Sequence, residues 1–594
     1  MAALFTTPKR NDTTAGTHVA EPDVRRRIGL AHGSWRRVTR RIVAGAVCAL
    51  TVSSLLMPSV SLAAEWVKVG GNKYSTAASD EAGTWSWDGA DDLKLNNYNG
   101  GEIQAAGKLN VNYSGTNIVT AEWIESINVS HGTNENAELN IQGDEGGTLS
   151  VTSTEDAILS TGNINIDGAG SVNATSTGLD AINAGGDLAI KGSGNVNATG
   201  ASDGIRANGN ITIDDSGAVT ARATKDKGIG VDKNLTIKGG GTVEASSADG
   251  EALWSGGNIN ISDGSQVKAS SEKDAAVEAK GSLAATNASL NVNGVEYGVY
   301  ARKGITLDHA NVTVRASKGR YGGANALFTY QDDIVVKNGS TVDAFAEGEV
   351  SAAFSTRNDR PNEKGGHIYI SDSVVKAIAR YVENGDGPIP YSENQDGETR
   401  REPQGENIGI IAQTSEGITP AVISIIRSKV TAEGDTAAIF ARAMSADGKT
   451  IGTIKIENAA IQTPEGGKVI DYRKLRDGIY EAGQAIGTGD ATVDSLYIKA
   501  VAKSTTIAPP EVAKPEDPKP DETKPAESKP AESKQNPKPE GSKPTKAVAA
   551  STTKAKTTGV LAATGDTSGA AIVATVLAGT AAIAAGTMAS RKRS

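Results

Sequence analysis

The feature that most constrains this sequence is an internal repeat. Between Gly162 and Ala279 the same series of short apolar stretches returns with a period of about 24 residues. The first apolar position of successive copies is filled by Ile164, Leu188, Ile211, Leu235, Ile259 and Leu283. A fixed period in this range is typical of a solenoid, in which each repeat is one structural unit that stacks on the next.

Within each copy, apolar and polar residues alternate with the period of two that is typical of a β-strand. Gly, Asp, Asn and Ser separate these stretches and favour turns. The interval from the first strand to the second is constant, since Ile166 precedes Val172, and Ile190 precedes Val196, by six residues. Stacked coils require such constancy, because a slip of one residue would turn a strand inside out. We therefore predict an all-β parallel β-helix with three short strands per coil.

The pattern also assigns side chains to the inside and outside of this helix. The second strand is predicted to contribute an inner column of small residues, which would keep the core narrow: Ala174, Ala198, Ala221, Ala245 and Ala269. The third strand is placed at 179–181, 205–207 and 229–231 in the first three copies. A β-sandwich of hairpins is the alternative, but hairpin strands need not recur at one fixed interval.

Composition and charge narrow the function. Of the 594 residues only 4% are aromatic, which suits a narrow stacked core. The formal net charge is −10, and residues 1–63 and 565–594 contribute +6 and +2, which leaves −18 on residues 64–564. So acidic a body argues against nucleic-acid binding. The single cysteine, Cys48, lies in a segment that we expect to be removed, so the mature chain is predicted to have no disulfide.

Residues 1–64 have the pattern of a secretory signal. A basic stretch that ends at Arg41 precedes an apolar run from Ile42 to Leu56, and small residues follow. This order predicts export with cleavage after Ala63 or Ala64. A membrane anchor is the weaker alternative, because the run is short for a span.

The next segments are predicted to form the helix and its N-terminal end. Residues 65–160 are interpreted as a cap with the first coils, and residues 161–505 as the β-helix with an insertion near 380–407. Such insertions lie in loops and often carry function. The tryptophan pair at 85–87 is interpreted either as a sugar-stacking platform or as part of the cap that covers the first coil. The candidate carbohydrate-binding side chains are Trp85, Trp87 and Trp254.

The sequence changes abruptly after the repeats. Residues 506–560 are rich in Pro, Lys and Glu, a composition that favours extended polyproline II and cannot form a packed core. At roughly 3 Å per residue such a linker reaches more than about 100 Å. Residues 561–594 then combine a short polar motif, an apolar run from 570 to 589, and Arg591-Lys592-Arg593. The run and its basic end predict one membrane-spanning helix with a cytoplasmic tail.

The motif that precedes this run is Leu561-Ala562-Ala563-Thr564-Gly565. It resembles the sorting signal of Gram-positive surface proteins, the LPXTG type, in the variant with Ala in place of Pro. The resemblance implies that a sortase cleaves between Thr564 and Gly565 and joins Thr564 to peptidoglycan, so that the membrane is engaged only transiently through the C-terminal segment. A plain C-terminal membrane anchor is the alternative.

The repeat region resembles right-handed parallel β-helices of the pectate-lyase type, and more closely the carbohydrate-binding β-helix domains of bacterial surface proteins. The resemblance rests on the coil pattern and on Trp85-Ser86-Trp87-Asp88-Gly89 followed by Leu93-Lys94-Leu95. A lyase would need stacked carboxylates for Ca²⁺ and a nearby base. The outer columns that we expect are Asn165, Ala189, Thr212, Thr236 and Asn260; then Asn173, Asn197, Thr220, Glu244 and Lys268; then Asp180, Arg206 and Gly230. None of them contains three carboxylates.

Other polar residues leave two interpretations open. The Asn and Thr columns can hydrogen-bond sugars or stabilise the stack. Four aspartates at the first corner either bind Ca²⁺ or form turns: Asp167, Asp214, Asp215 and Asp263. Ca²⁺ is the only cofactor that we consider.

We therefore expect a cell-wall-anchored adhesin without enzyme activity, which binds a polysaccharide or host glycan. A wall-anchored polysaccharide lyase or hydrolase and a passive surface or biofilm protein are the alternatives.

Overall fold

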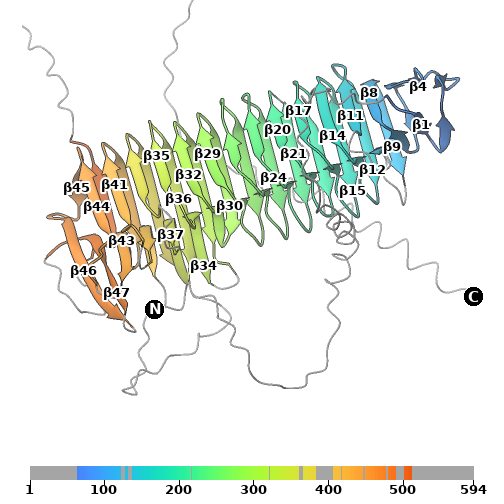
Figure 1. The fold of residues 1–594 in the computed structure, drawn as a ribbon. Helices are drawn as coiled ribbons and strands as arrows, with labels where there is room; N and C mark the ends of the chain where they lie inside the picture. The colour runs from blue at the N-terminus through green and yellow to red at the C-terminus, as the bar shows by residue number, and fades with distance from the viewer. Residues whose placement is uncertain are drawn as a thin grey trace, which may run out of the picture. The chain divides into compact units, whose positions relative to one another are not determined.

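The computed structural model describes residues 63–510, with gaps at 122–126, 131–136, 216, 320–321, 360–364, 383–405, 416–417, 446–447, 477–478 and 490–500. It confirms the predicted right-handed parallel β-helix. Three parallel sheets, which we call A, B and C, run along the stack, and the chain passes through A, C and B in each coil (Figure 1).

Sheet A contains the first strand of each coil, from β5 to β44. Its strands are β5 (Asp92–Asn96), β8 (Lys108–Ser114), β11 (Glu138–Gly143), β14 (Asn163–Gly168), β17 (Leu188–Lys191), β20 (Ile211–Asp214), β23 (Leu235–Lys238), β26 (Ile259–Ile261), β29 (Ser282–Thr286), β32 (Gly304–Asp308), β35 (Ile334–Lys337), β38 (Ile368–Ser371), β41 (Val422–Ile426) and β44 (Thr453–Glu457).

Sheet C contains the second strand of each coil. Its strands are β6 (Asn99–Gly100), β9 (Thr116–Ala121), β12 (Thr148–Ser153), β15 (Ser171–Ser176), β18 (Val196–Gly200), β21 (Ala218–Ala223), β24 (Thr242–Ser247), β27 (Gln266–Ser271), β30 (Ser289–Val295), β33 (Asn311–Ser317), β36 (Thr341–Gly348), β39 (Val374–Tyr381) and β42 (Lys429–Gly434).

Sheet B contains the third strand of each coil. Its strands are β7 (Ile103–Ala106), β10 (Ile127–Ser130), β13 (Ile158–Ser160), β16 (Ile182–Ala184), β19 (Ile205–Ala207), β22 (Ile229–Val231), β25 (Leu253–Ser255), β28 (Val277–Ala279), β31 (Tyr297–Ala301), β34 (Gly323–Thr329), β37 (Val350–Asn358), β40 (Asn407–Thr414) and β43 (Ala437–Ser445).

Antiparallel strands close both ends of the stack. At the N-terminus β4 (Trp85–Trp87) pairs with β5, and β1 (Trp66–Val69) pairs with β7; β2 (Asn72–Tyr74) and β3 (Ala78–Ser79) complete this end. At the C-terminus β48 (Ser504–Ala508) lies antiparallel to β42, and β47 (Ile479–Gly487) to β43; β45 (Ala460–Thr463) and β46 (Lys468–Arg476) complete it. These strands cover the open edges of the sheets, which limits edge-to-edge association.

The core is a set of apolar columns in which each residue contacts its equivalents one coil away. Ile164 pairs with Leu188, and Leu188 with Ile211, and all are at most 1% exposed. The predicted alanine column is also confirmed, since Ala174, Ala198 and Ala221 are aligned and buried. One coil cannot bury these faces alone, so the stability of each coil depends on its neighbours.

The corner between sheets A and C requires a left-handed residue in successive coils. In the coils from β14 to β29, residues with positive φ at this corner include Gly168, Gly192, Asp215, Gly239, Asp263 and Asn287. Gly, Asn and Asp adopt this conformation most readily. Two of the four corner aspartates therefore form the turn, as one of our two interpretations predicted.

No helix in the described part of the chain is long and apolar enough to cross a membrane. The predicted span at 570–589 lies outside the described residues, as do the sorting motif, most of the signal segment, most of the linker and most of the 380–407 insertion.

Candidate functional site

A polar groove lies on the outer face of sheet A and crosses five coils, from β14 to β26. It encloses about 630 Å³. It is lined by the outward residues of these strands and by the corners that precede them: Asn163, Asn165, Asp187, Leu188, Ala189, Lys191, Asn210, Thr212, Asn234, Thr236, Asn258 and Asn260. The floor contains no aromatic ring, so hydrogen bonding dominates what the groove offers a ligand.

The central row of this groove is the first outer column that the sequence predicted. Asn165, Ala189 and Thr212 occupy equivalent positions in neighbouring strands, and Thr236 and Asn260 continue the row. The row therefore repeats at about 4.8 Å, the spacing of neighbouring strands. Within the described residues, the hydroxyls of Thr212 and Thr236 have no hydrogen-bond partner, so they are free to bind a ligand.

One edge of the groove is fixed by a ladder of side chains at the corner before sheet A. The Oδ1 atom of Asn163 accepts the backbone N–H of Asp187 at 2.8 Å, and that of Asp187 accepts the N–H of Asn210 at 2.6 Å. Asn234 and Asn258 continue the ladder, with 2.9 Å from Asn258 N to Asn234 Oδ1. Because every rung joins two coils, this edge is held rigidly.

The opposite edge carries charge. Lys238 Nζ lies 2.9 Å from Asp214 Oδ2, and both side chains are partly exposed. Lys191 precedes Asp214 in the same column. Asp214 therefore forms an ion pair at the groove, in addition to its position next to the corner.

The turn that precedes each sheet B strand carries a column of buried carboxylates that the sequence analysis missed. We assigned the third strand of the first copy to 179–181, but the strand is Ile182–Ala184, and Asn183 pairs with Arg206. Asp180 belongs instead to the column of Asp156 and Asp203. Within the described part of the chain, the outer columns of the strands themselves contain no three carboxylates, and Asn183 takes the place that we gave to Asp180.

These carboxylates connect successive coils. Asp156 Oδ1 accepts the N–H of Asp180 at 2.9 Å, and Asp180 Oδ1 accepts the N–H of Asp203 at 2.9 Å. Asp203 Oδ1 in turn accepts the N–H of Lys227 at 2.7 Å. The recurring Asp-Ala-Ile or Asp-Gly-Ile at 156–158, 180–182 and 203–205 was the sequence signal for this column.

Burial raises the pKa of three carboxyl groups in and before the strands of sheet B. Burial, reinforced by neighbouring carboxylates, raises the pKa of both Asp180 and Asp203 to about 6. Burial and the carboxyl group of Glu278 raise the pKa of Glu251 to about 7. The ionised form of these carboxyl groups is therefore less favourable in the folded protein than in water.

The three candidate tryptophans lie in two different environments. Trp85 and Trp87 are only 7% and 2% exposed and belong to the core of the N-terminal end, where the ring of Trp85 lies 5.1 Å from that of Tyr74. Their rings have no open face for a sugar, so the sugar-stacking interpretation of this pair is corrected in favour of the cap. Trp254 is partly exposed on the outer face of sheet B, and its role in carbohydrate binding stays a prediction.

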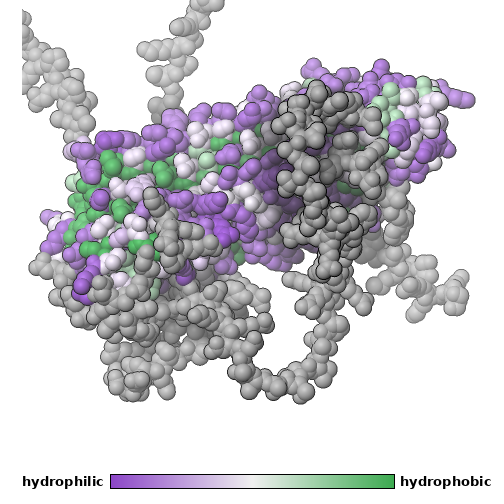
Figure 2. All heavy atoms as spheres, viewed as in Figure 1, coloured by the Kyte–Doolittle hydropathy of each residue, from purple (hydrophilic) through white to green (hydrophobic). Residues whose placement is uncertain are grey.

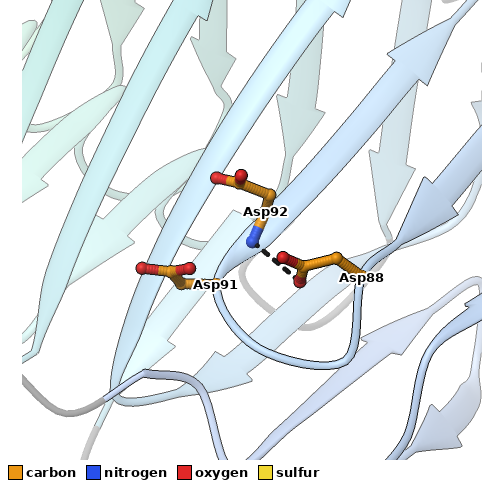
Figure 3. Close-up of side chains that lie close together, drawn as sticks. All are labelled: Asp88, Asp91 and Asp92. Atoms are coloured by element: carbon orange, nitrogen blue, oxygen red, sulfur yellow. Dashed lines mark hydrogen bonds between the residues drawn. The ribbon is translucent and has the colours of Figure 1, made fainter.

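Three carboxylates lie close together in the turn between β4 and β5. The ligand atoms of Asp88, Asp91 and Asp92 lie within 4.8 Å of one another (Figure 3). Asp88 Oδ1 already accepts the N–H groups of Ala90 and Asp92, at 2.8 and 3.1 Å. Oxygen ligands of this kind suit Ca²⁺. These two bonds are also typical of an ordinary turn, so we do not assign a metal site here.

The remaining predicted residues are placed as follows. The Asp167 carboxylate accepts the N–H of Gly168 at the corner. Ala63 forms a bridge with Lys108 and Ala64 is buried, and cleavage next to them stays a prediction. Leu561, Ala562, Ala563, Thr564 and Gly565 lie outside the described residues.

The chain matches no family model, no curated protein and no solved structure.

Proposed function

We propose that this chain is a cell-wall-anchored surface protein that binds a polysaccharide or host glycan in the groove on sheet A. The observation that carries the proposal is the central row of the groove, where Thr212, Thr236 and Asn260 lie in register with two free hydroxyls. Amide and hydroxyl groups are the partners that sugar hydroxyls require.

The row favours a linear glycan that lies across the coils. Its repeat of about 4.8 Å is close to the length of one pyranose ring, so consecutive sugars would meet equivalent polar groups. The central row itself carries no charge, and the two charged residues that line the groove, Asp187 and Lys191, have opposite signs. A neutral or weakly charged chain therefore fits the groove best.

The test is binding of purified protein to a glycan array, followed by substitution of the central row. The double variant Thr212→Val and Thr236→Val removes both hydroxyls and preserves side-chain shape. We expect affinity for the best glycan to fall about thirtyfold, because each of the two hydrogen bonds contributes about 1 kcal/mol. Thr220→Val on sheet C is the matched control, and equal losses in both proteins would refute the groove.

Anchoring rests on the sequence of residues 561–594 and is tested separately. If a sortase joins Thr564 to peptidoglycan, Thr564→Ala should move the chain from the cell-wall fraction to the membrane fraction. Wall attachment of this variant at the normal level would rule out the sorting signal. Wall fractionation needs no ligand, so it is independent of the glycan assay.

The column of Asp156, Asp180 and Asp203 favours one alternative, a polysaccharide lyase or hydrolase, because a carboxyl group whose pKa is raised to about 6, as in Asp180 and Asp203, can act as a general acid. New reducing ends in pooled acidic polysaccharides, lost in Asp203→Asn, would establish that activity. Absence of both binding and cleavage would leave a passive surface protein.

A further inference from the structure

A second surface, on the outer face of sheet B, combines aromatic rings with carboxylates. Trp254 on β25, Glu278 on β28 and Tyr300 on β31 occupy equivalent positions in three successive coils. Together with Glu251, three residues before Trp254, they form what we call the aromatic–acidic strip. The two rings are partly exposed and lie about two coils, roughly 9.6 Å, apart.

Neighbouring aromatic residues hold one end of the strip in place. The ring of Tyr300 lies 5.6 Å from that of Phe328, and the ring of Tyr297 lies 5.4 Å from that of Tyr300. Phe328 is the equivalent of Tyr300 in the next coil and is only 5% exposed, so it holds this cluster in place. The orientation of Tyr300 is therefore fixed before any ligand arrives, which lowers the entropic cost of binding.

The strip already binds two ammonium groups of the chain itself. Lys227 Nζ lies 5.5 Å from the centre of the Trp254 ring, a cation–π distance. Lys280 Nζ contacts the carboxylate of Glu278, which is largely buried. Both contacts are formed by lysine, so they display the chemistry that this surface accepts.

The strip has a second carboxyl group, Glu251, which lies beside Glu278. The pKa of Glu251 is raised to about 7 by burial and by the neighbouring carboxyl group of Glu278. An additional cation nearby would favour the ionised form of a carboxyl group whose pKa is raised this far. An incoming ammonium group would therefore be favoured by the carboxylates as well as by the aromatic faces.

We propose that the aromatic–acidic strip binds lysine-rich polypeptide segments of a partner protein. Lysine side chains of the partner would lie on Trp254 and Tyr300 and pair with the carboxylates of Glu278 and Glu251. This goes beyond the proposed glycan binding, because the strip lies on a different sheet and recognises positive charge. A glycan with free amino groups is the competing ligand, but the contacts formed by the chain itself are those of lysine.

The experiment measures binding of the full chain to a synthetic Gly-Lys repeat peptide and to the same peptide with every lysine acetylated. Acetylation removes the charge and preserves the backbone. We expect the lysine peptide to bind at least about tenfold more tightly than the acetylated one, and this preference to fall in Trp254→Ala and Glu278→Gln. A fall of about tenfold is expected for the tryptophan, from the usual strength of a cation–π contact.

Two further variants separate this site from general attraction to an acidic protein. Lys280→Met frees the Glu278 carboxylate, so we expect it to tighten peptide binding several-fold. Lys268→Met is the matched control, because Lys268 pairs with Glu244 on sheet C at 2.7 Å. A structural role for Lys280 would not increase affinity.

Three results would overturn the proposal. The first is equal binding of the lysine and acetylated peptides. The second is an equal effect of the two lysine variants. The third is a glucosamine oligosaccharide that binds the strip more tightly than the peptide. None of these results depends on the Thr212 and Thr236 variants, so failure here and failure of the glycan proposal are distinguishable.

Discussion

The strands of sheet B differ in length and in burial between the first half of the helix and the second half. From β16 to β28 the strands of sheet B have three residues, and their outer positions are Asn183, Arg206, Gly230, Trp254 and Glu278. From β34 to β43 these strands have seven to nine residues, and β40 is buried at every position. Figure 2 shows apolar residues gathered over the C-terminal coils on the face in view.

The two regions also differ in how they accommodate a buried charged side chain. In the regular coils, carboxylates such as Asp180 lie in a column and satisfy backbone donors of the next coil. In the C-terminal coils a second apolar cluster, with Ile411 and Phe440, lies outside the main core. Arg442 lies next to this cluster at 5% exposure and requires neighbouring polar side chains. The first region therefore buries carboxylates in a hydrogen-bonded column, whereas the second buries one cation among carboxylates and an amide.

The largest effect is expected at Arg442. Its Nη1 lies 2.8 Å from Glu406 Oε2, its Nε donates to Gln413 Oε1 at 2.8 Å, and Glu481 lies 3.8 Å away. Burial alone would lower the pKa of Arg442, but Glu406 and Glu481 more than offset this effect and raise it. Arg442→Met would leave the buried Glu481 and the partly buried Glu406 without their cation, so we expect a loss of about 3–5 kcal/mol in unfolding free energy.

Chemical denaturation followed by circular dichroism measures this loss, and hydrogen exchange should localise it to β40, β43 and β47. Arg315→Met is the control, because the ion pair of Arg315 with Asp343 is partly exposed and should contribute less than about 1 kcal/mol. Similar losses in the two variants would contradict the contrast between the regions.

The regular coils were predictable because local and long-range signals agree there. The inward positions Ile164, Leu188 and Ile211 alternate with polar residues and recur at nearly the same interval, so register follows from pattern alone. The third strand was misplaced by three residues because we interpreted Leu179 as an inward residue. In the structure Leu179 lies in the turn before β16 and is 43% exposed. A strand of only three residues has too little alternation to correct such an error.

The sequence of the C-terminal coils contains a weaker pattern from which to predict strand positions. Ile334, Ile368, Ile423 and Ile454 are equivalent core positions but lie 31 to 55 residues apart, so no period marks them. Strand β40 has apolar residues on both faces and therefore no alternation. In the site, the column of Thr212 and Thr236 was predicted, but the groove was not, because its walls depend on side chains of neighbouring coils.

The second prediction concerns the carboxylates of the regular coils. The folded protein raises the pKa of Asp180 to about 6, above the value of about 3.9 in an unfolded chain. Ionisation is therefore unfavourable in the folded state, so stability should fall as pH rises from about 4 to about 6 and then level off. Asp180→Asn retains an acceptor for the N–H of Asp203 and removes the charge.

We expect Asp180→Asn to raise the unfolding free energy at pH 7.5 by on the order of 2 kcal/mol and to change it little at pH 4.5. Denaturation at both pH values measures this. Asp249→Asn is the control, because Asp249 is exposed beside Lys273 and should show only a small effect. A destabilised Asp180→Asn protein at pH 7.5 would contradict the sign of this prediction.

The smallest effect is expected at the corner between sheets A and C, where both regions use the same backbone conformation. Asp263 in the regular coils has φ of 57°, and Arg427 in the C-terminal coils has φ of 47°. The Arg427 guanidinium forms two bonds to Asp372, at 2.6 and 2.8 Å. Its pairing therefore offsets part of the cost of a left-handed arginine, which is about 1 kcal/mol.

Asp263→Ala should destabilise the helix by about 1 kcal/mol, because alanine adopts the left-handed conformation poorly and forms no local hydrogen bond. Asp263→Gly should change stability by only a few tenths of a kcal/mol. At Arg427 the glycine substitution should also be nearly neutral, since relief of strain offsets the loss of an exposed ion pair. If Arg427→Gly instead cost as much as Asp263→Ala, the ion pair with Asp372 would be holding the C-terminal corner, and the two regions would differ at the corner as well as in sheet B.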